Sequence, residues 1–211
     1  MEIIWFDTLA STQSTLIEGL KHKVFAAPVC IGTSLQSDGR GSRGNGWIGE
    51  EGNLFISVAL RRSDLPNDLK LESTSIYLAF IMKELLASLG SNVWLKWPND
   101  FYLGEKKIGG VITTLVGETL VCGIGINLVS APDRFSVIDI VVDSQKLTGY
   151  YVSLLSELPS WKQIFSKYQL EFEYSRVFFT HHNYEKIALK DALLLEDGSL
   201  ECDGQRIYSL R

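Results

Sequence analysis

The stretch from Gln36 to Trp47 constrains the fold most, because it is rich in a residue that disfavours regular structure. Four of the nine residues 39–47 are glycine and two are arginine. Glycine destabilises a helix by about 1 kcal/mol relative to alanine and also weakens the interior of a strand. An apolar, β-branched run at 28–35 precedes this stretch, and an alternation of apolar and small residues at 53–60 follows it; both are typical of strands. We therefore expect a long loop over residues 36–52 between two strands.

The rest of the chain mixes strand and helix patterns. Further strands are expected at 2–7, 93–97, 107–115 and 119–127. Helices are expected from Ser11-Thr12 to about Lys21, from Leu71 to Leu89, and over 150–175 with a break at Pro159. This mixture predicts an α+β fold with a mixed β-sheet and helices.

The C-terminal residues have a different pattern. Short strands are expected at 192–196, 199–202 and 205–210, separated by Asp197-Gly198 and Asp203-Gly204. Asp-Gly dipeptides favour tight hairpin turns. We therefore predict a small β-domain at 183–211, docked on a larger domain at 1–180.

The composition excludes several classes of protein. Of 211 residues, 45% are hydrophobic and 21% charged, and the formal net charge is −5. Such a chain is not disordered, and it lacks an overall attraction to nucleic acid or an anionic membrane, so we expect neither partner. The N-terminus lacks a signal-peptide pattern, and no apolar run is long enough to span a bilayer. Three distant cysteines without a CxxC pair predict reduced thiols and a cytoplasmic location.

Residues 36–47 also have the chemistry of an anion site. Backbone N–H groups in glycine-rich turns form concavities that bind anions, and arginines add charge-assisted hydrogen bonds. Gly39, Gly41 and Gly44 match the G-x-G-x-x-G pattern, but a dinucleotide site needs a helix there, and Gly44-Asn45-Gly46 does not favour one. The alternative without a ligand is a mobile surface loop.

A second polar constellation follows the strand at 93–97. In Lys96-Trp97-Pro98-Asn99-Asp100, the proline stiffens the turn that presents Asn99 and Asp100. In Lys106-Lys107-Ile108-Gly109-Gly110, an ammonium can point into a pocket while the backbone approaches a ligand. Each feature has a structural alternative: a solvated lysine pair, Asp100 as a turn residue, and Asn127 as a strand terminator.

Together these residues resemble the catalytic region of the BirA-type biotin protein ligases. The matching segments are Ser11-Thr12-Gln13, Gln36 through Trp47, Lys96 through Asp100, Lys107-Ile108-Gly109-Gly110 and Gly123-Ile124-Gly125-Ile126-Asn127. Residues 191–211 are similar to the small SH3-like C-terminal domain of that family. The resemblance covers nearly the whole chain and implies a class II synthetase-like catalytic domain.

The resemblance implies a ligase that uses ATP to make biotinyl-5′-adenylate and transfers biotin to a lysine of the biotin carboxyl carrier protein of acetyl-CoA carboxylase. Mg²⁺ would arrive with ATP, with no metal site of the chain's own. The implied catalytic residues are Arg40, Lys107 and Asp100. The implied biotin-binding residues are Ser11, Thr12, Gln13, Gln36, Gly39, Arg40, Gly41, Ser42, Lys107 and Gly110. The implied ATP-binding residues are Arg40, Arg43, Trp47, Asn99, Lys107 and Asn127.

Two other functions remain open: a lipoate or octanoate ligase or transferase, and a non-catalytic biotin- or nucleotide-binding module. Ser42 and Asn45 stand where the family usually has basic residues, so we expect the adenylate to be held less tightly. The first expected strand begins near Glu2, which leaves no room for the DNA-binding domain of some relatives, so we expect no repressor function. The sequence leaves open whether the protein is a homodimer.

Overall fold

A mixed β-sheet forms the centre of the computed structural model, which describes residues 1–41, 46–182 and 185–208. Its strands run in the order β1 (Glu2–Leu9), β2 (Val29–Arg40), β4 (Leu54–Arg61), β8 (Thr119–Ile126), β7 (Lys106–Val116), β6 (Asp100–Leu103) and β5 (Trp94–Lys96), with β3 (Gly46–Gly49) paired to β2. The β1–β2 pair is parallel and the other pairs are antiparallel. The expected α+β class is confirmed.

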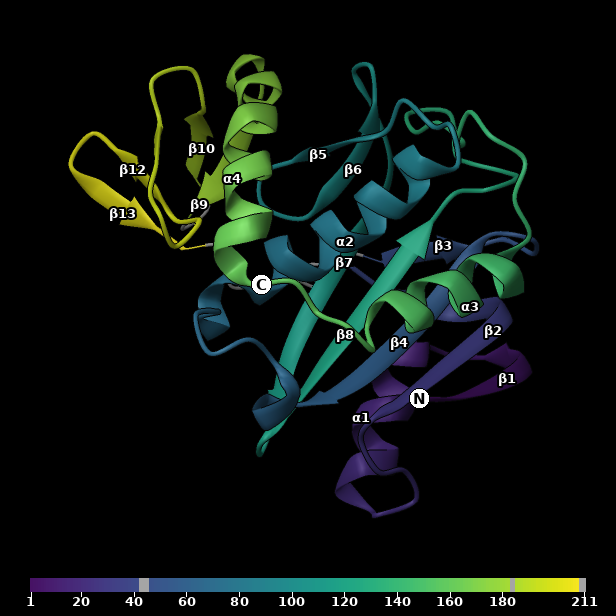
Figure 1. The fold of residues 1–211 in the computed structure, drawn as a ribbon. Helices are drawn as coiled ribbons and strands as arrows, with labels where there is room; N and C mark the ends of the chain where they lie inside the picture. Colours follow the sequence, from purple (N-terminus) through teal and green to yellow (C-terminus); the bar gives the residue numbers. More distant parts are fainter. Residues whose placement is uncertain (42–45, 183–184, 209–211) are drawn as a thin grey trace.

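Helices pack on both faces of this sheet (Figure 1). The larger core lies under α2 (Thr74–Ser88), α3 (Ser144–Leu154) and α4 (Trp161–Glu171), with short 3-10 turns η2 (Arg62–Asp64), η3 (Leu71–Ser73) and η4 (Phe172–Val177). On the other face, α1 (Thr12–Lys21) places Leu16 in a smaller cluster with residues of β2, β4 and β8. Within the described residues, no helix has the length and apolar character needed to cross a membrane.

The expected loop over 36–52 is only partly correct, because residues 36–40 and 46–49 belong to strands. β2 continues to Arg40 and pairs with β3, which brings Gly39 opposite Trp47. The two backbones approach so closely that a Cβ on Gly39 would lie 2.5 Å from the carbonyl oxygen of Trp47. A side chain on Gly49 would likewise collide with Gln36. Glycine therefore permits this strand pair, although its low intrinsic propensity had predicted a loop.

The small C-terminal β unit is present and is larger than expected. β11 (Leu193–Leu194), β12 (Leu200–Cys202) and β13 (Gln205–Ile207) form an antiparallel sheet, and β9 (Phe179–His182) pairs with β10 (Glu185–Ala188), which the sequence did not predict. Helix α3 also begins at Ser144, before the expected helical stretch. The small sheets lie beside α4 at one end of the molecule (Figure 1).

Two tryptophans join the C-terminal unit to the main core. The indole Nε1 of fully buried Trp97 donates to the carbonyl oxygen of Gly198 at 2.8 Å. Nε1 of Trp161, on α4, donates to the carbonyl oxygen of Glu196 at 2.8 Å. The turn at 196–198 is therefore part of the packing behind the Lys96–Asp100 turn.

Candidate active site

The first turn of α1 and the middle of β2 hold one group of polar side chains together. Thr12 donates to Oε1 of Gln36 through its backbone N–H (2.8 Å) and its hydroxyl (3.2 Å). Ser11 is the N-cap of α1, and its hydroxyl accepts from the backbone N–H of Ser14. Ser11, Thr12 and Gln36 are all buried, so these hydrogen bonds offset the cost of removing them from water.

Ser57 of β4 supports this group from the sheet and was not predicted. Its fully buried hydroxyl lies 3.0 Å from Oγ1 of Thr12 and 3.1 Å from Oε1 of Gln13. Because side chains alternate along a strand, Ser57 of β4 faces α1 while Ile56 and Val58 face the larger core. A lone hydroxyl in an apolar strand was the available signal in the sequence.

On the β6–β7 side of the site, Lys107 and Asp100 form an ion pair. The Lys107 Nζ lies 2.6 Å from Oδ1 of Asp100, and 24% and 21% of the two side chains are exposed. The same Nζ lies 5.9 Å from the centre of the Trp47 ring. Burial, with a smaller effect of the Asp100 charge, raises the pKa of neighbouring Tyr102 to about 12, so this phenol is neutral at pH 7.

Two asparagines of the expected nucleotide site hold the backbone. Asn99 donates through Nδ2 to the carbonyl oxygen of Val111 and accepts at its own carbonyl from the N–H of Val111 at 2.9 Å. Asn127 donates through Nδ2 to the carbonyl oxygen of Ser136 at 3.1 Å and thereby shapes the loop after β8. Their contacts to a nucleotide stay predictions.

Two glycines of β8 leave the sheet surface hollow beside α1. Gly123 and Gly125 lie on the α1 face of the strand, on which Val121 is covered by α1. A Cβ on Gly123 would lie 2.7 Å from Oε1 of Gln13, and one on Gly125 would lie 3.0 Å from the Trp47 ring. The indole can therefore lie directly on the strand.

These elements line one cavity. Its lining contains the expected residues Ser11, Thr12, Gln13, Gln36, Arg40, Gly41, Trp47, Asn99, Asp100, Lys107 and Gly110, together with Val111, Ile112, Gly123, Ile124 and Gly125. Arg40 and Lys107 thus share one cleft. Gly39 and Asn127 are not in this lining, and the expected site residues Ser42 and Arg43, with Asn45, lie outside the described residues.

The cavity combines two cations from different strands with a neutral hydrogen-bonding network. Two cations can hold two anionic groups side by side and offset their repulsion. The buried network can hold an uncharged polar group. Across the part of the chain that the structure describes, no cluster of three or more His, Cys, Asp or Glu side chains could ligate a metal.

Comparison with known proteins places the chain in a family. A sequence model of the biotin/lipoate A/B protein ligase family matches residues 5–129, more than half of the chain, and the chain belongs to this family. The bifunctional ligase/repressor BirA of Escherichia coli (strain K12) is 35% identical over 136 residues, which are 61% of this chain and 41% of that protein. The chain thus matches about two fifths of the length of this curated relative.

Two solved structures have the same fold over nearly the whole chain. The biotin acetyl coenzyme A carboxylase synthetase of Helicobacter pylori, with bound biotinylated ATP, is 42% identical, with a TM-score of 0.93 and coverage of 98% of this chain and 99% of that one. The biotin protein ligase of Aquifex aeolicus, in complex with biotin and ATP, has a TM-score of 0.77 at 23% identity, covering 100% of this chain and 96% of that one.

Proposed function

We propose that this protein is a biotin–[acetyl-CoA-carboxylase] ligase, which makes biotinyl-5′-adenylate from biotin and ATP and transfers biotin to a lysine of a biotin carboxyl carrier protein. The observation that carries the proposal is the convergence of Arg40 and Lys107 with the network of Thr12 and Gln36 in one cavity. The similarity to the H. pylori synthetase along nearly the full chain supports it.

The neutral network receives the ureido ring of biotin. Ser11, Thr12 and Gln36 offer donors and acceptors at one end of the cavity. A buried donor or acceptor of the ring left unpaired would cost about 1–3 kcal/mol, so these side chains give specificity for that ring.

The first step joins two anions. An oxygen of the biotin carboxylate forms a bond to the α-phosphorus, the bond from that phosphorus to the β-phosphate oxygen breaks, and pyrophosphate leaves. Arg40 and Lys107 hold the carboxylate and phosphate oxygens, while Trp47 and Asn99 contact the nucleotide. Mg²⁺ bound to the ATP substrate would neutralise part of the phosphate charge. Positioning and preorganised positive charge supply most of the acceleration in such steps.

The second step transfers the acyl group. The ε-amine of the carrier lysine forms a bond to the acyl carbon, the bond from that carbon to the phosphate oxygen breaks, and AMP leaves as the amine loses a proton. Asp100 orients this amine or takes its proton. Arg40 and Lys107 stabilise the departing phosphate.

We also propose a cytoplasmic location and a small SH3-like domain at 183–211 on a catalytic domain at 1–180. The three free cysteines support the first proposal, because free thiols are typical of a reducing compartment. The antiparallel sheet of β11, β12 and β13 supports the second.

The test measures pyrophosphate release from Mg-ATP with biotin, lipoate or octanoate, without carrier, followed by mass spectrometry of a carrier domain. Release with biotin alone and a biotinylated carrier lysine are expected. Release with lipoate or octanoate instead would make the protein a lipoate- or octanoate-type family member. No release with any acid would make it a binding module.

A further inference from the structure

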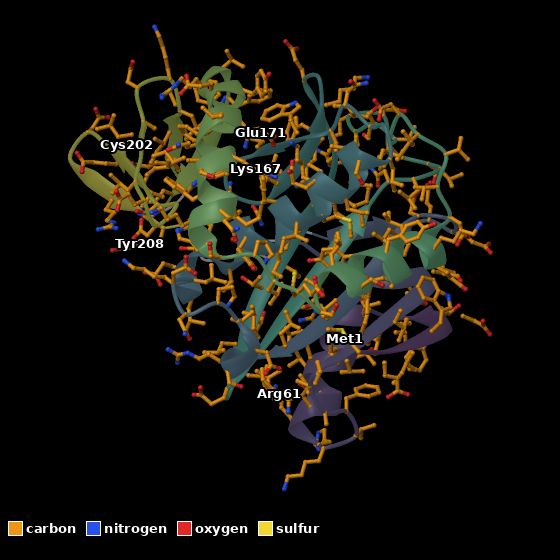
Figure 2. The ribbon with its side chains drawn as sticks, in the orientation of Figure 1. Met1, Arg61, Lys167, Glu171, Cys202 and Tyr208 are labelled. Carbon is orange, nitrogen blue, oxygen red and sulfur yellow. The ribbon has the colours of Figure 1, made fainter. Side chains whose placement is uncertain are left out.

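The edge strand β5 directs two backbone N–H groups away from its partner strand. β5 is the last strand of the sheet and pairs with β6. On its outer side, the N–H of Leu95 donates to Oε1 of Glu171 at 2.5 Å, and the N–H of Trp97 donates to Oγ of Ser175 at 3.1 Å. Glu171 is the last residue of α4, where Figure 2 labels it near β5, and Ser175 lies in η4.

The spacing of donors and acceptors matches. Leu95 and Trp97 are two residues apart, which is roughly 6.6 Å along a strand. Glu171 and Ser175 are four residues apart, which is roughly 6–8 Å along an α-helix or 3-10 helix. Side chains of α4 and η4 therefore take the place of a further strand along the β5 edge.

Strand β5, which Glu171 and Ser175 hold, leads directly into the site. Asp100 lies opposite Lys96 in the β5–β6 pair, and its carboxylate binds Lys107. Asn99 is tied to Val111 of β7 by two hydrogen bonds. The turn that carries Asn99 and Asp100 is thus held by β7 inside the site and by α4 and η4 from outside.

The carboxylate of Glu171 accepts the hydrogen bond from Leu95 in a buried position, where a charged group is costly. Only 9% of the side chain is exposed, and burial raises its pKa, while hydrogen bonds from Lys83 and Leu95 oppose the rise. Its Oε2 lies 2.5 Å from Nζ of Lys83 on α2. Since buried ion pairs contribute little net stability, packing alone does not account for a carboxylate here. The ion pair fixes the direction in which Oε1 meets the N–H of Leu95.

We infer that Glu171, with Ser175, is a positioning residue for the ligase reaction: it fixes the outer edge of β5 and thereby places Asp100 against Lys107. This inference rests on the proposed function. Neither side chain lines the cavity, so both act through β5. Misplacing a reacting group by about 1 Å can slow a reaction roughly 100-fold, so a small shift of β5 is enough to be measured.

Two double variants isolate the acceptor: K83M/E171Q and K83M/E171L. Both remove the buried ion pair, but only glutamine keeps an oxygen for the N–H of Leu95. The measurements are hydrogen–deuterium exchange of residues 94–101 and the separate rates of adenylate formation and carrier transfer, well below each melting temperature. We expect the leucine variant to exchange faster and to transfer about tenfold more slowly, with an unchanged KM for biotin. The glutamine variant should resemble the wild type.

The control is D68N. The Asp68 carboxylate accepts from the N–H groups of Trp161 and Lys162, both at 3.0 Å, at the opposite end of α4. D68N should lower the melting temperature without changing transfer. Equal transfer rates or equal exchange in the two double variants would overturn the inference. An inactive wild-type protein would reject the proposed function instead, and the exchange comparison would still decide whether Glu171 fixes β5.

Discussion

Lys107 and Asp100 form an ion pair of 2.6 Å across the β6–β7 hairpin, beside the cavity that also contains Arg40. The pair brings together the cation proposed to stabilise the first step and the carboxylate proposed to act in the second. In the proposed mechanism the two groups serve different steps, so removing each of them should affect the two half-reactions differently.

Lys107→Ala should slow adenylate formation about 100- to 1,000-fold, the usual loss when one group that stabilises transition-state charge is removed. Asp100→Ala should leave adenylate formation largely intact and slow transfer to the carrier. Pyrophosphate release measures the first step, and single-turnover transfer from preformed adenylate measures the second.

The exposed neighbour Lys106 gives the matched control, because Lys106→Ala removes a lysine from the same strand without touching the cavity. Its rates should equal those of the wild type. Equal loss of both half-reactions in Asp100→Ala would contradict the role given to that carboxylate.

Ser57→Ala should weaken biotin binding about tenfold, because Thr12 and Gln13 lose a buried partner worth about 1.4 kcal/mol. Isothermal titration with biotin measures the change. The exposed Ser63→Ala variant should bind biotin like the wild type. Unchanged affinity in Ser57→Ala would show that this hydroxyl does not order the biotin-binding side chains.

Gly125→Ala should raise the KM for ATP about tenfold, because the new Cβ would lie 3.0 Å from the Trp47 ring and displace it. Gly149→Ala is the control: a Cβ there meets nothing within 4 Å, so it should leave KM unchanged and stabilise α3 by up to about 1 kcal/mol. An unchanged KM in Gly125→Ala would argue against a nucleotide contact of Trp47.

Asp197→Asn should make the folding stability less dependent on pH below pH 7. Burial alone would raise the pKa of Asp197, but hydrogen bonds from Ser199 and the charges of Arg206 and Lys70 outweigh burial and lower it. A carboxyl with a lowered pKa in the folded state stabilises the protein above its ordinary pKa near 4, and this contribution disappears as the pH falls through the lowered value.

Melting temperatures measured from pH 7 to pH 3 test this expectation. Asp197→Asn should lower the free energy of unfolding at pH 7 by roughly 1.5–3 kcal/mol, the contribution of a hydrogen bond to a charged group, and should therefore melt at a lower temperature than the wild type. The difference should shrink toward pH 3. Asp203→Asn, at an exposed turn of positive φ (+49°) that asparagine tolerates, should follow the wild-type curve. A constant difference across the range would exclude linkage through Asp197.

Much of the fold was predictable because its patterns are local. The strand patterns at 53–60 and 119–127 became adjacent strands, and Asp203-Gly204 became a hairpin turn with positive φ at both residues. The strand β3 was not predictable, because close approach to β2, a tertiary effect, overrides the low strand propensity of glycine. The β9–β10 hairpin has little alternation of apolar and polar residues and gave no signal.

The candidate site also contains residues that the sequence predicted and residues that it did not. Arg40 and Lys107 stand in motifs with distinctive residue types, and the structure gives them a common cavity. Ser57 and Glu171 stand in an apolar strand and an amphipathic helix, where such residues are ordinarily a small filler and a solvated charge. The packing of α1 on β4 gives Ser57 its partners, and the packing of α4 beside β5 and α2 gives Glu171 its partners.

The hydrogen bond from Trp97 to Gly198 has a consequence for synthesis of the chain. On the ribosome, the indole of Trp97 has no native acceptor until translation has passed Gly198, 101 residues later in the sequence. A nascent chain that has not reached Gly198 would therefore contain every residue of the cavity lining and still lack the hydrogen bond that packs behind the turn of Asn99 and Asp100.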